Sequence, residues 1–298
     1  MTKKIIIIKR YCMKTYNDCI PCLVRQALGA ARFVTADEKI HQTVLKKSLA
    51  AMAVMDMNQS PPMMARCIQT VIAEVTGNKD PYKEIKKQCN AFCLDQLDGL
   101  RAMVERSEAP LETAIRLSIA GNIIDFGAFS AIDTETIFDT IDYAMANKVT
   151  GDMDNLLDRL VSANAILWIA DNAGEIVFDR LVLEKMDMGR VVFVVRGGPA
   201  LNDATLEDAV ETGITDIVTT IGSGGVIPGT VLDMCSPVFL QAFDRADLII
   251  AKGQGNYETL PHDDDRIFFL FKAKCPVVAE SAGVNLNDMV VRKGLSDR

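Results

Sequence analysis

Three polar side chains follow two strand-like stretches in the second half of the chain, and their types suit a metal site. The apolar run 165–170 predicts a strand buried on both faces, and Asp171 and Asn172 come directly after it. The next apolar run, 191–195, leads into a polar loop that contains Asp203. In a right-handed βαβ unit the two strand ends are neighbours, so Asp203 can approach Asp171 and Asn172. Carboxylate and amide oxygens favour Mg²⁺, Mn²⁺ or a similar divalent cation over a closed zinc site.

A simpler interpretation makes Asp203 a helix cap and Asp171 a turn residue, because capping is the commoner use of an isolated aspartate. It does not explain why two successive strands both end in polar clusters, so we favour the metal site. Glu175 lies at the far end of the same turn. We expect it in the first turn of the next helix or as a partner of the site, and count it among the candidate substrate-binding residues.

Candidate phosphate ligands lie after the later strands. The turn 222–230 contains Gly222 and Ser223 and could bring backbone N–H groups to a phosphate, but a turn without any ligand explains it equally well. Lys252, Lys272 and Lys274 also follow strands. A lysine is usually solvated, yet one beside a metal edge can neutralise a phosphoryl group. We expect this role first for Lys252 and less firmly for the other two.

The segment 121–127 interrupts a helix in the first half of the chain with two polar residues, Asn122 and Asp125. Such a break could cover the carboxyl edge of the sheet and contribute both side chains to the pocket. A plain turn between helices is an equally good interpretation.

The hydrophobic pattern divides the chain into two halves. Helical periodicity dominates the first, with predicted helices from Asn17 or Asp18 onward and at 37–57, 62–75, 81–100, 108–120 and 133–145. Strand-like runs alternate with helices in the second, at 165–170, 191–195, 216–220, 248–251 and 267–271, with 277–279 as a further candidate. The sequence therefore predicts an all-helical domain, 1–150, and an α/β domain with a mostly parallel sheet, 151–298.

The connecting and terminal segments carry weaker expectations. We expect residues 149–160 to join the two domains. Residues 3–10 are predicted to form a first strand or an ordered tail, and residues 285–298 a polar tail that frays.

Composition excludes several classes of protein. The 298 residues carry a net charge of −8, which argues against general nucleic-acid binding and against an anionic membrane surface. No apolar run approaches the roughly 20 residues of a membrane span, and 3–10 is too short for the core of a signal peptide. Eight cysteines indicate a reducing compartment, so we expect a cytoplasmic protein. The sequence does not indicate an oligomeric state.

The cysteines and histidines do not identify a catalytic centre. Cys19 with Cys22, and Cys89 with Cys93, resemble half-sites for zinc, but cysteines on helices more often pack in a core. The two histidines have no catalytic neighbour in sequence, and the chain lacks a G-x-S-x-G elbow, so a histidine-based hydrolase is not expected.

Taken together, these motifs resemble those of the DUF89 family of metal-dependent damage-control phosphatases, in its prokaryotic branch with an early C-x-x-C. The resemblance covers nearly the whole chain, and the D-N-A-G-E block at 171–175 followed by N-D-A at 202–204 is its most specific part. Its other motifs are D-C-I-P-C at 18–22, D-P-Y at 80–82 with Lys86 and Asn90, G-N-I-I-D at 121–125, Asp208, the 222–230 turn and K-G-Q-G-N-Y at 252–257.

The resemblance implies a helical domain packed on a Rossmann-like, three-layer α/β domain. It also implies Mg²⁺, Mn²⁺, Co²⁺ or Ni²⁺ held by Asp171, Asn172 and Asp203, and hydrolysis of small phosphorylated metabolites such as sugar phosphates or damaged phospho-cofactor intermediates. Lys252 and, second, Lys274 would lie near the phosphate, with Asn122 and Asp125 close by. The chain departs from the eukaryotic pattern, which has Arg-Thr-x-Lys near 271–274.

Our hypothesis is hydrolysis by a water that the cation activates. One alternative makes Asp171 a covalent nucleophile, as in haloacid-dehalogenase-like phosphatases, although their second turn acid would fall at Ala173. The other is a metal- or nucleotide-binding regulatory module without turnover.

Overall fold

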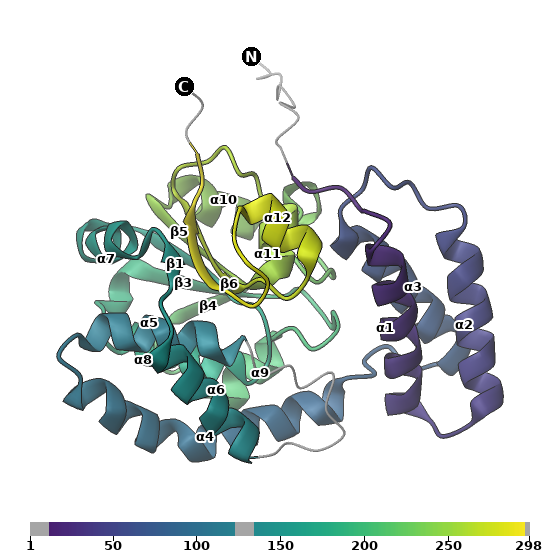
Figure 1. The fold of residues 1–298 in the computed structure, drawn as a ribbon, viewed down its shortest axis with the longest axis horizontal. Coiled ribbons are helices and arrows are strands. Elements are labelled where there is room, and N and C mark those ends of the chain that lie inside the picture. Colours follow the sequence, from purple (N-terminus) through teal and green to yellow (C-terminus); the bar gives the residue numbers. More distant parts are fainter. Residues whose placement is uncertain (1–11, 123–133, 296–298) are drawn as a thin grey trace.

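The computed structural model describes residues 12–122 and 134–295 of the chain. The predictions for residues 3–10 and for Asp125 fall outside the described residues. Figure 1 shows the path of the chain, with the strands grouped in one sheet and the first three helices standing to one side of it.

The first three helices form a packing unit of their own. They are α1 (Cys19–Val34), α2 (Glu38–Met52) and α3 (Pro61–Thr76). Asp37 begins α2 by accepting a hydrogen bond from the N–H of Lys39, and Gly77 ends α3 in the left-handed conformation. Helically spaced apolar side chains close their shared core, among them Leu23, Ala27, Val44, Ile68 and Ile72.

The next helices belong with the sheet. They are α4 (Lys83–Arg106), α5 (Pro110–Gly121) and α6 (Thr134–Ala146), and they lie on one face of the sheet with α7 (Met153–Ser162) and α8 (Glu175–Leu183) (Figure 1). Side chains of α4 to α6 and of the strands form one continuous hydrophobic cluster.

Seven strands form the sheet in the order β1-β7-β6-β5-β2-β3-β4. All neighbours are parallel except β6 and β7. The strands are β1 (Thr150–Gly151), β2 (Ile166–Ile169), β3 (Val191–Val195), β4 (Thr219–Gly222), β5 (Leu248–Lys252), β6 (Ile267–Lys272) and β7 (Met289–Lys293). The central strand β2 lies between β3 and β5, so the carboxyl ends of these three strands meet at one edge.

Strand side chains alternate between two cores. Trp168, Phe193 and Ile250 face the layer of α4 to α8, whereas Leu167, Val194 and Ile249 face the opposite layer. That layer contains α10 (Pro237–Arg245), α11 (Gly253–Thr259) and α12 (Pro276–Ala282). The short α9 (Leu206–Glu211) follows β3, and two 3₁₀ turns, Met188–Arg190 and Leu232–Met234, complete the described elements.

This architecture confirms the predicted α/β fold class with a helical N-terminal region, three layers and a mostly parallel sheet. That the chain consists of two domains divided at residue 150 stays a prediction. The packing crosses that boundary, because α4 to α6 share their core with the sheet.

Several local predictions were wrong. The range 277–279 is helical, because Pro276 starts α12, and β4 begins at Thr219 because the backbone from 213 to 218 is a series of turns. Residues 285–298 were expected to fray, but they contain β7, and its Met289, Val290 and Val291 are buried against β6. The expected joint, 149–160, holds β1 and α7, and its role as a boundary between domains stays a prediction. Within the described residues, no helix is both long and apolar enough to cross a membrane.

Candidate active site

The turns after β2 and β3 are joined by backbone hydrogen bonds. The N–H of Ala173 donates to the carbonyl of Asn202 at 2.9 Å, and the N–H of Ala204 donates to the carbonyl of Asp171 at 2.7 Å. These bonds flank an isolated antiparallel bridge between Asn172 and Asp203. The predicted approach of Asp203 to Asp171 and Asn172 is thus fixed by the main chain.

Asp203 does not cap the helix that follows it. Thr205 is the N-cap of α9, and Asp208 completes a capping box by accepting hydrogen bonds from the Thr205 N–H and hydroxyl at 2.8 and 2.7 Å. The simpler interpretation of Asp203 is therefore wrong.

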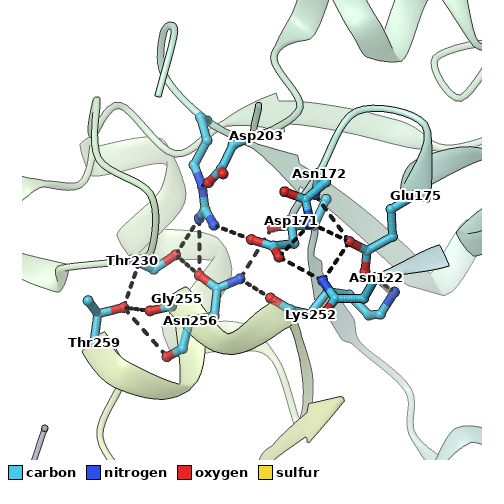
Figure 2. Close-up of polar contacts among 12 residues, drawn as sticks. Asn122, Asp171, Asn172, Glu175, Asp203, Thr230, Lys252, Gly255, Asn256 and Thr259 are labelled. Atoms are coloured by element: carbon cyan, nitrogen blue, oxygen red, sulfur yellow. Dashed lines mark hydrogen bonds and ion pairs between the residues drawn. The ribbon is translucent and has the colours of Figure 1, made fainter. Parts of the chain in front are cut away.

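The carboxylate of Asp171 is held from three sides. Its Oδ2 accepts hydrogen bonds from the side-chain amides of Asn122 and Asn172, each at 2.9 Å. Its Oδ1 lies 3.4 Å from the Arg196 guanidinium, which also donates to Asp203 at 2.5 Å. Arg196 thus ties the two carboxylates together. Figure 2 shows Asp171, Asn172 and Asp203 at this edge of the sheet.

Arg196 is a site residue that sequence reasoning missed. Arg196 also donates to Thr230 Oγ1 and Asn256 Oδ1, both at 3.0 Å, so four of its five N–H donors have acceptors inside the protein. Asn256 in turn donates to the carbonyls of Ala170 and Lys252 (Figure 2). The signal that could have found Arg196 is its position directly after β3 at the carboxyl edge.

Glu175 binds the two side-chain amides that hold Asp171. Its Oε2 accepts hydrogen bonds from the amides of Asn122 and Asn172, both at 2.9 Å (Figure 2). Its Oε1 pairs with Lys252 at 2.7 Å. Both amides therefore bridge Glu175 and Asp171, which fixes the orientation of the Asp171 carboxylate.

Lys252 does not reach the pocket, which corrects the prediction that it binds phosphate. Its side chain is 0% exposed, and its ammonium contacts Glu175, Asp179 at 2.5 Å and the Ser118 carbonyl at 3.1 Å. Three acceptors use all three N–H donors of an ammonium. The strand alternation explains this direction, because Leu248, Ile250 and Lys252 share the face toward α5 and α8.

Glycine is required at position 253, where the backbone leaves β5 and passes close to Asp171. Its φ is +77°, and a Cβ there would lie 1.8 Å from Oδ2 of Asp171 and 2.1 Å from its Cγ. Only glycine allows this backbone to pass so close to the carboxylate.

Burial by itself disfavours the ionised form of the acids at this edge. Burial, with the nearby Asp203 and Glu175 carboxylates, raises the pKa of Asp171 well above its ordinary value. Burial also raises the pKa of Asp203 to about 6, although Arg196 opposes the shift. Burial alone would raise the pKa of Glu175, but the Lys252 ammonium and the amide hydrogen bonds lower it overall. Two carboxylates that resist ionisation would gain from an added cation.

The oxygen atoms present fit a hard divalent cation. Asn172 uses its Nδ2 on Asp171 and Glu175, which leaves Oδ1 as the atom it can offer to a metal beside Asp171 and Asp203. Carboxylate and amide oxygens are the ligands that Mg²⁺ and Mn²⁺ accept. Within residues 12–122 and 134–295, no group of three or more His, Cys, Asp and Glu side chains is arranged to hold a metal.

A cavity of about 320 Å³ opens in front of these ligands. It lies between the starts of α1 and α3 on one side and the strand ends on the other. Its lining includes Asp171, Asn172, Asp203 and Lys274, together with Asp18, Cys19, Cys22, Gln26, Gln254, Glu258 and Cys275. The predicted ligands and Lys274 therefore share one pocket, and Cys19 and Cys22 belong to its wall.

Other predicted residues lie elsewhere. Asn122 contacts Asp171 from behind the pocket. Lys272 is half-buried with its ammonium 5.8 Å from the centre of the Tyr143 ring. The turn at Gly222 and Ser223 does not line the cavity, since Ser223 is buried and its N–H donates to the Val195 carbonyl. Cys89 and Cys93 are core residues whose thiol pKa values burial raises far above normal.

Comparison with known proteins identifies the family. The family model described as the damage-control phosphatase ARMT1-like domain matches residues 15–290. The chain belongs to this family.

Two relatives and a solved structure illustrate the likeness. An uncharacterized protein of Methanocaldococcus jannaschii is 38% identical over 94% of this chain and 96% of its own length. A damage-control phosphatase of Pyrococcus horikoshii is 33% identical over 91% of this chain and 95% of its own. The crystal structure of a DUF89 family protein from Pyrococcus horikoshii matches with a TM-score of 0.85 and 31% identity, over 95% of this chain and 99% of that one. The resemblance to DUF89 is confirmed.

Replacing Lys252 by methionine tests the ion-pair cluster behind the site. Lys252→Met leaves the Glu175 and Asp179 carboxylates buried without their cation. We expect the free energy of unfolding in urea to fall by about 3–5 kcal/mol. The control is Lys274→Met at an exposed lysine, which should change stability by less than about 0.5 kcal/mol. Equal stability of Lys252→Met and wild type would contradict this account.

Gly253→Ala tests the close approach to Asp171. The new Cβ must displace the carboxylate, so we expect turnover of p-nitrophenyl phosphate to fall by about 100-fold or more. The control is Gly77→Ala, which has a similar φ of +73° and no atom within 4 Å of the added Cβ. It carries the same backbone strain far from the site and should retain turnover. Similar losses in both variants would show that strain, and not the Asp171 contact, is responsible.

Glu258 gives a pH dependence with a definite sign. Burial raises its pKa from 4.5 to about 7, against the hydrogen bond from Gln254, and the Cys19 and Cys275 thiols lie close enough for its charge to raise their pKa values. Between pH 4.5 and 7 the folded state binds more protons than the unfolded state, so stability falls as the pH rises. We expect Glu258→Gln to raise the free energy of unfolding by up to about 3 kcal/mol at pH 8 and by less than about 1 kcal/mol at pH 5.

Denaturation of wild type and variant at both pH values measures this difference. Glu280→Gln, at an exposed position of α12, is the matched control and should show no pH-dependent gain. A gain from Glu258→Gln that is equal at pH 5 and pH 8 would refute the assignment.

Proposed function

We propose that this protein is a metal-dependent phosphatase that hydrolyses small phosphorylated metabolites, such as sugar phosphates or damaged phospho-cofactor intermediates. One observation carries the proposal. Asp171, Asn172 and Asp203 present oxygen atoms to one cavity, and Arg196 and Glu175 hold them in place. The similarity of this chain to damage-control phosphatases of Pyrococcus horikoshii and Archaeoglobus fulgidus, the latter 34% identical over 94% of this chain, supports it.

Asp171, Asn172 and Asp203 would hold the cation, with Mg²⁺, Mn²⁺, Co²⁺ and Ni²⁺ as the candidates. Bound there, it would supply positive charge for the phosphoryl oxygens and acidify a water molecule. Arg196 keeps the two carboxylates at a fixed separation, because its guanidinium contacts both. Fixed charges of this kind lower the barrier without reorganisation during the reaction.

Lys274 is our candidate for the phosphate ligand. Among the described residues that line the cavity it is the one cation, and it is exposed. Its charge also acts on Asp171, whose pKa it lowers against the larger effect of burial. Burial, together with the charge of Lys274, lowers the pKa of the neighbouring Lys272. Lys274 therefore gives the cavity wall a positive charge that would attract a phosphate group, and Lys272 acts on it only from outside the lining.

The residue two positions after Asp171 is Ala173, and it is buried. No second acid therefore occupies the turn position that an aspartyl-phosphate mechanism of the haloacid-dehalogenase type would use. Hydrolysis without a covalent intermediate is the simpler proposal.

The test is turnover of p-nitrophenyl phosphate and a panel of phosphorylated metabolites by protein loaded with each of the four metals. We expect Asp171→Ala to lower kcat/KM by about 100-fold or more, because it removes both a ligand and the partner of Arg196. Asp154→Ala, at an exposed position of α7, is the control and should keep wild-type rates.

Wild-type turnover by Asp171→Ala would refute the site assignment. If no phosphomonoester is turned over with any metal while a metal or nucleotide raises the melting temperature, the protein is a binding module instead.

A further inference from the structure

We propose that Glu258 is the general acid of the reaction, and that its carboxyl group gives a proton to the ester oxygen of the substrate as the bond between that oxygen and phosphorus breaks. The inference rests on the proposed function and deepens it, because it assigns the departure of the leaving group to a residue outside the candidate cation ligands. Glu258 lies in α11, is 7% exposed and lines the cavity together with those ligands.

The helix α11 places this carboxyl group within reach of a substrate held at the strand ends. Its first residue, Gly253, packs so tightly on Asp171 that a Cβ atom there would lie 1.8 Å from Oδ2. A rise of about 1.5 Å per residue puts the Cα atom of Glu258 about 7 Å farther along the helix axis. Side chains of a helix lean toward its N-terminus, so the Glu258 side chain extends back in the direction of Asp171. A phosphate ester bound at the strand ends can therefore present its ester oxygen to Glu258.

Gln254 determines which oxygen of Glu258 can carry the proton. The Gln254 Oε1 accepts a hydrogen bond from the backbone N–H of Lys274 at 3.2 Å, which fixes the orientation of the amide. The Gln254 Nε2 therefore faces Glu258 and donates to its Oε1 at 3.2 Å. Because an N–H donor occupies Oε1, the proton of the neutral carboxyl group belongs on Oε2. The described residues place no hydrogen bond on Oε2, so a ligand in the cavity can accept its proton.

Glu258 holds this proton because no cation lies directly beside it. Burial raises its pKa to about 7, and the hydrogen bond from Gln254 opposes the shift. Lys274 gives the same cavity a positive charge, but that charge lowers the pKa of Asp171 and is not among the causes of the shift at Glu258. A general acid is most efficient when its pKa lies near the pH at which it works. Glu258 meets this condition at neutral pH.

Glu258 is the best placed proton donor on this part of the cavity wall. The other titratable groups there are the thiols of Cys19, Cys22 and Cys275, together with Asp18 and Lys274. Burial raises the pKa values of the Cys19 and Cys275 thiols further above neutral pH. Asp18 and Lys274 are exposed to water. Neither histidine of the chain belongs to the lining that the described residues form.

The proposed step balances without a further reactant. Water attacks phosphorus and the ester bond between phosphorus and oxygen breaks. The leaving oxygen takes the electron pair of that bond and the proton from Oε2 of Glu258. The attacking water releases one proton, and the Glu258 carboxylate, which Gln254 stabilises by its hydrogen bond, regains one from the solvent. The ester and one water molecule therefore become an alcohol and inorganic phosphate.

A series of aryl phosphates tests the proposal, because its members have similar shapes and differ in their need for a proton. Phenolate is a strongly basic leaving group, whereas 2,4-dinitrophenolate is a stable anion that leaves without protonation. With Mn²⁺-loaded protein at pH 6, we expect Glu258→Gln to lower kcat/KM for phenyl phosphate by about 100-fold. The loss for 2,4-dinitrophenyl phosphate should be less than about threefold, with p-nitrophenyl phosphate between the two.

The ratio of kcat/KM for two esters is measured on one protein sample, so it is independent of the fraction that folds correctly. Glu258→Gln also keeps the size of the side chain, and a pocket that merely changed shape would lose activity toward all three esters alike. Glu280→Gln, exposed on α12, is the control and should hydrolyse the three esters at wild-type rates.

Three results would overturn the inference. They are an equal loss for phenyl and 2,4-dinitrophenyl phosphate in Glu258→Gln, wild-type turnover of phenyl phosphate by that variant, or a wild-type protein that hydrolyses 2,4-dinitrophenyl phosphate but not phenyl phosphate. Each of them includes phosphatase turnover and so leaves the proposed function intact. If wild-type protein hydrolyses none of the three esters with any of the four metals, the proposed function is wrong and the inference is wrong with it.

Discussion

The orientation of one buried carboxylate, that of Asp171, determines the geometry of the whole pocket. Asn122 and Asn172 fix one of its oxygens, Arg196 approaches the other, and Gly253 leaves room for it. Each contact comes from a different part of the chain. The helical region, three strand ends and the first turn of α11 must therefore be in place before the site exists, which explains why fold and site are inseparable here.

The buried charged residues around this carboxylate form two layers. The deeper layer is neutralised inside the protein, and the outer layer, which includes Asp171, lines the cavity. The deeper layer is closed, because Lys252 neutralises Glu175 and Asp179 and leaves no group for a ligand. The outer layer is open, since Asp171 and Asp203 share one guanidinium and keep raised pKa values. A bound cation would stabilise the ionised forms of these two carboxyl groups. Buried ion pairs of the closed kind contribute positioning more than stability.

Sequence reasoning identified the metal-ligand candidates because their placement follows from topology alone. Asp171 and Asp203 end neighbouring parallel strands, which any right-handed crossover brings together. It wrongly assigned the Lys252 side chain to the pocket. The end of a strand determines the edge of the sheet at which a residue lies, but not the face of the sheet to which its side chain points. Counting by two from Leu248 would have assigned Lys252 to the side of α5 and α8. The opposite cavity wall could not be predicted, because the docking of α1 and α3 depends on side-chain packing between segments distant in sequence. Glu258 and Gln26 line a common cavity only because that wall is in place.

The central claim is that the strand-end oxygens form a cation site, and anomalous scattering from crystals grown with Mn²⁺ tests it most directly. The account predicts one strong anomalous peak within about 2 Å of oxygens of Asp171, Asn172 and Asp203. A peak among the sulfurs of Cys19, Cys22 and Cys275, with none between the strand ends, would contradict it.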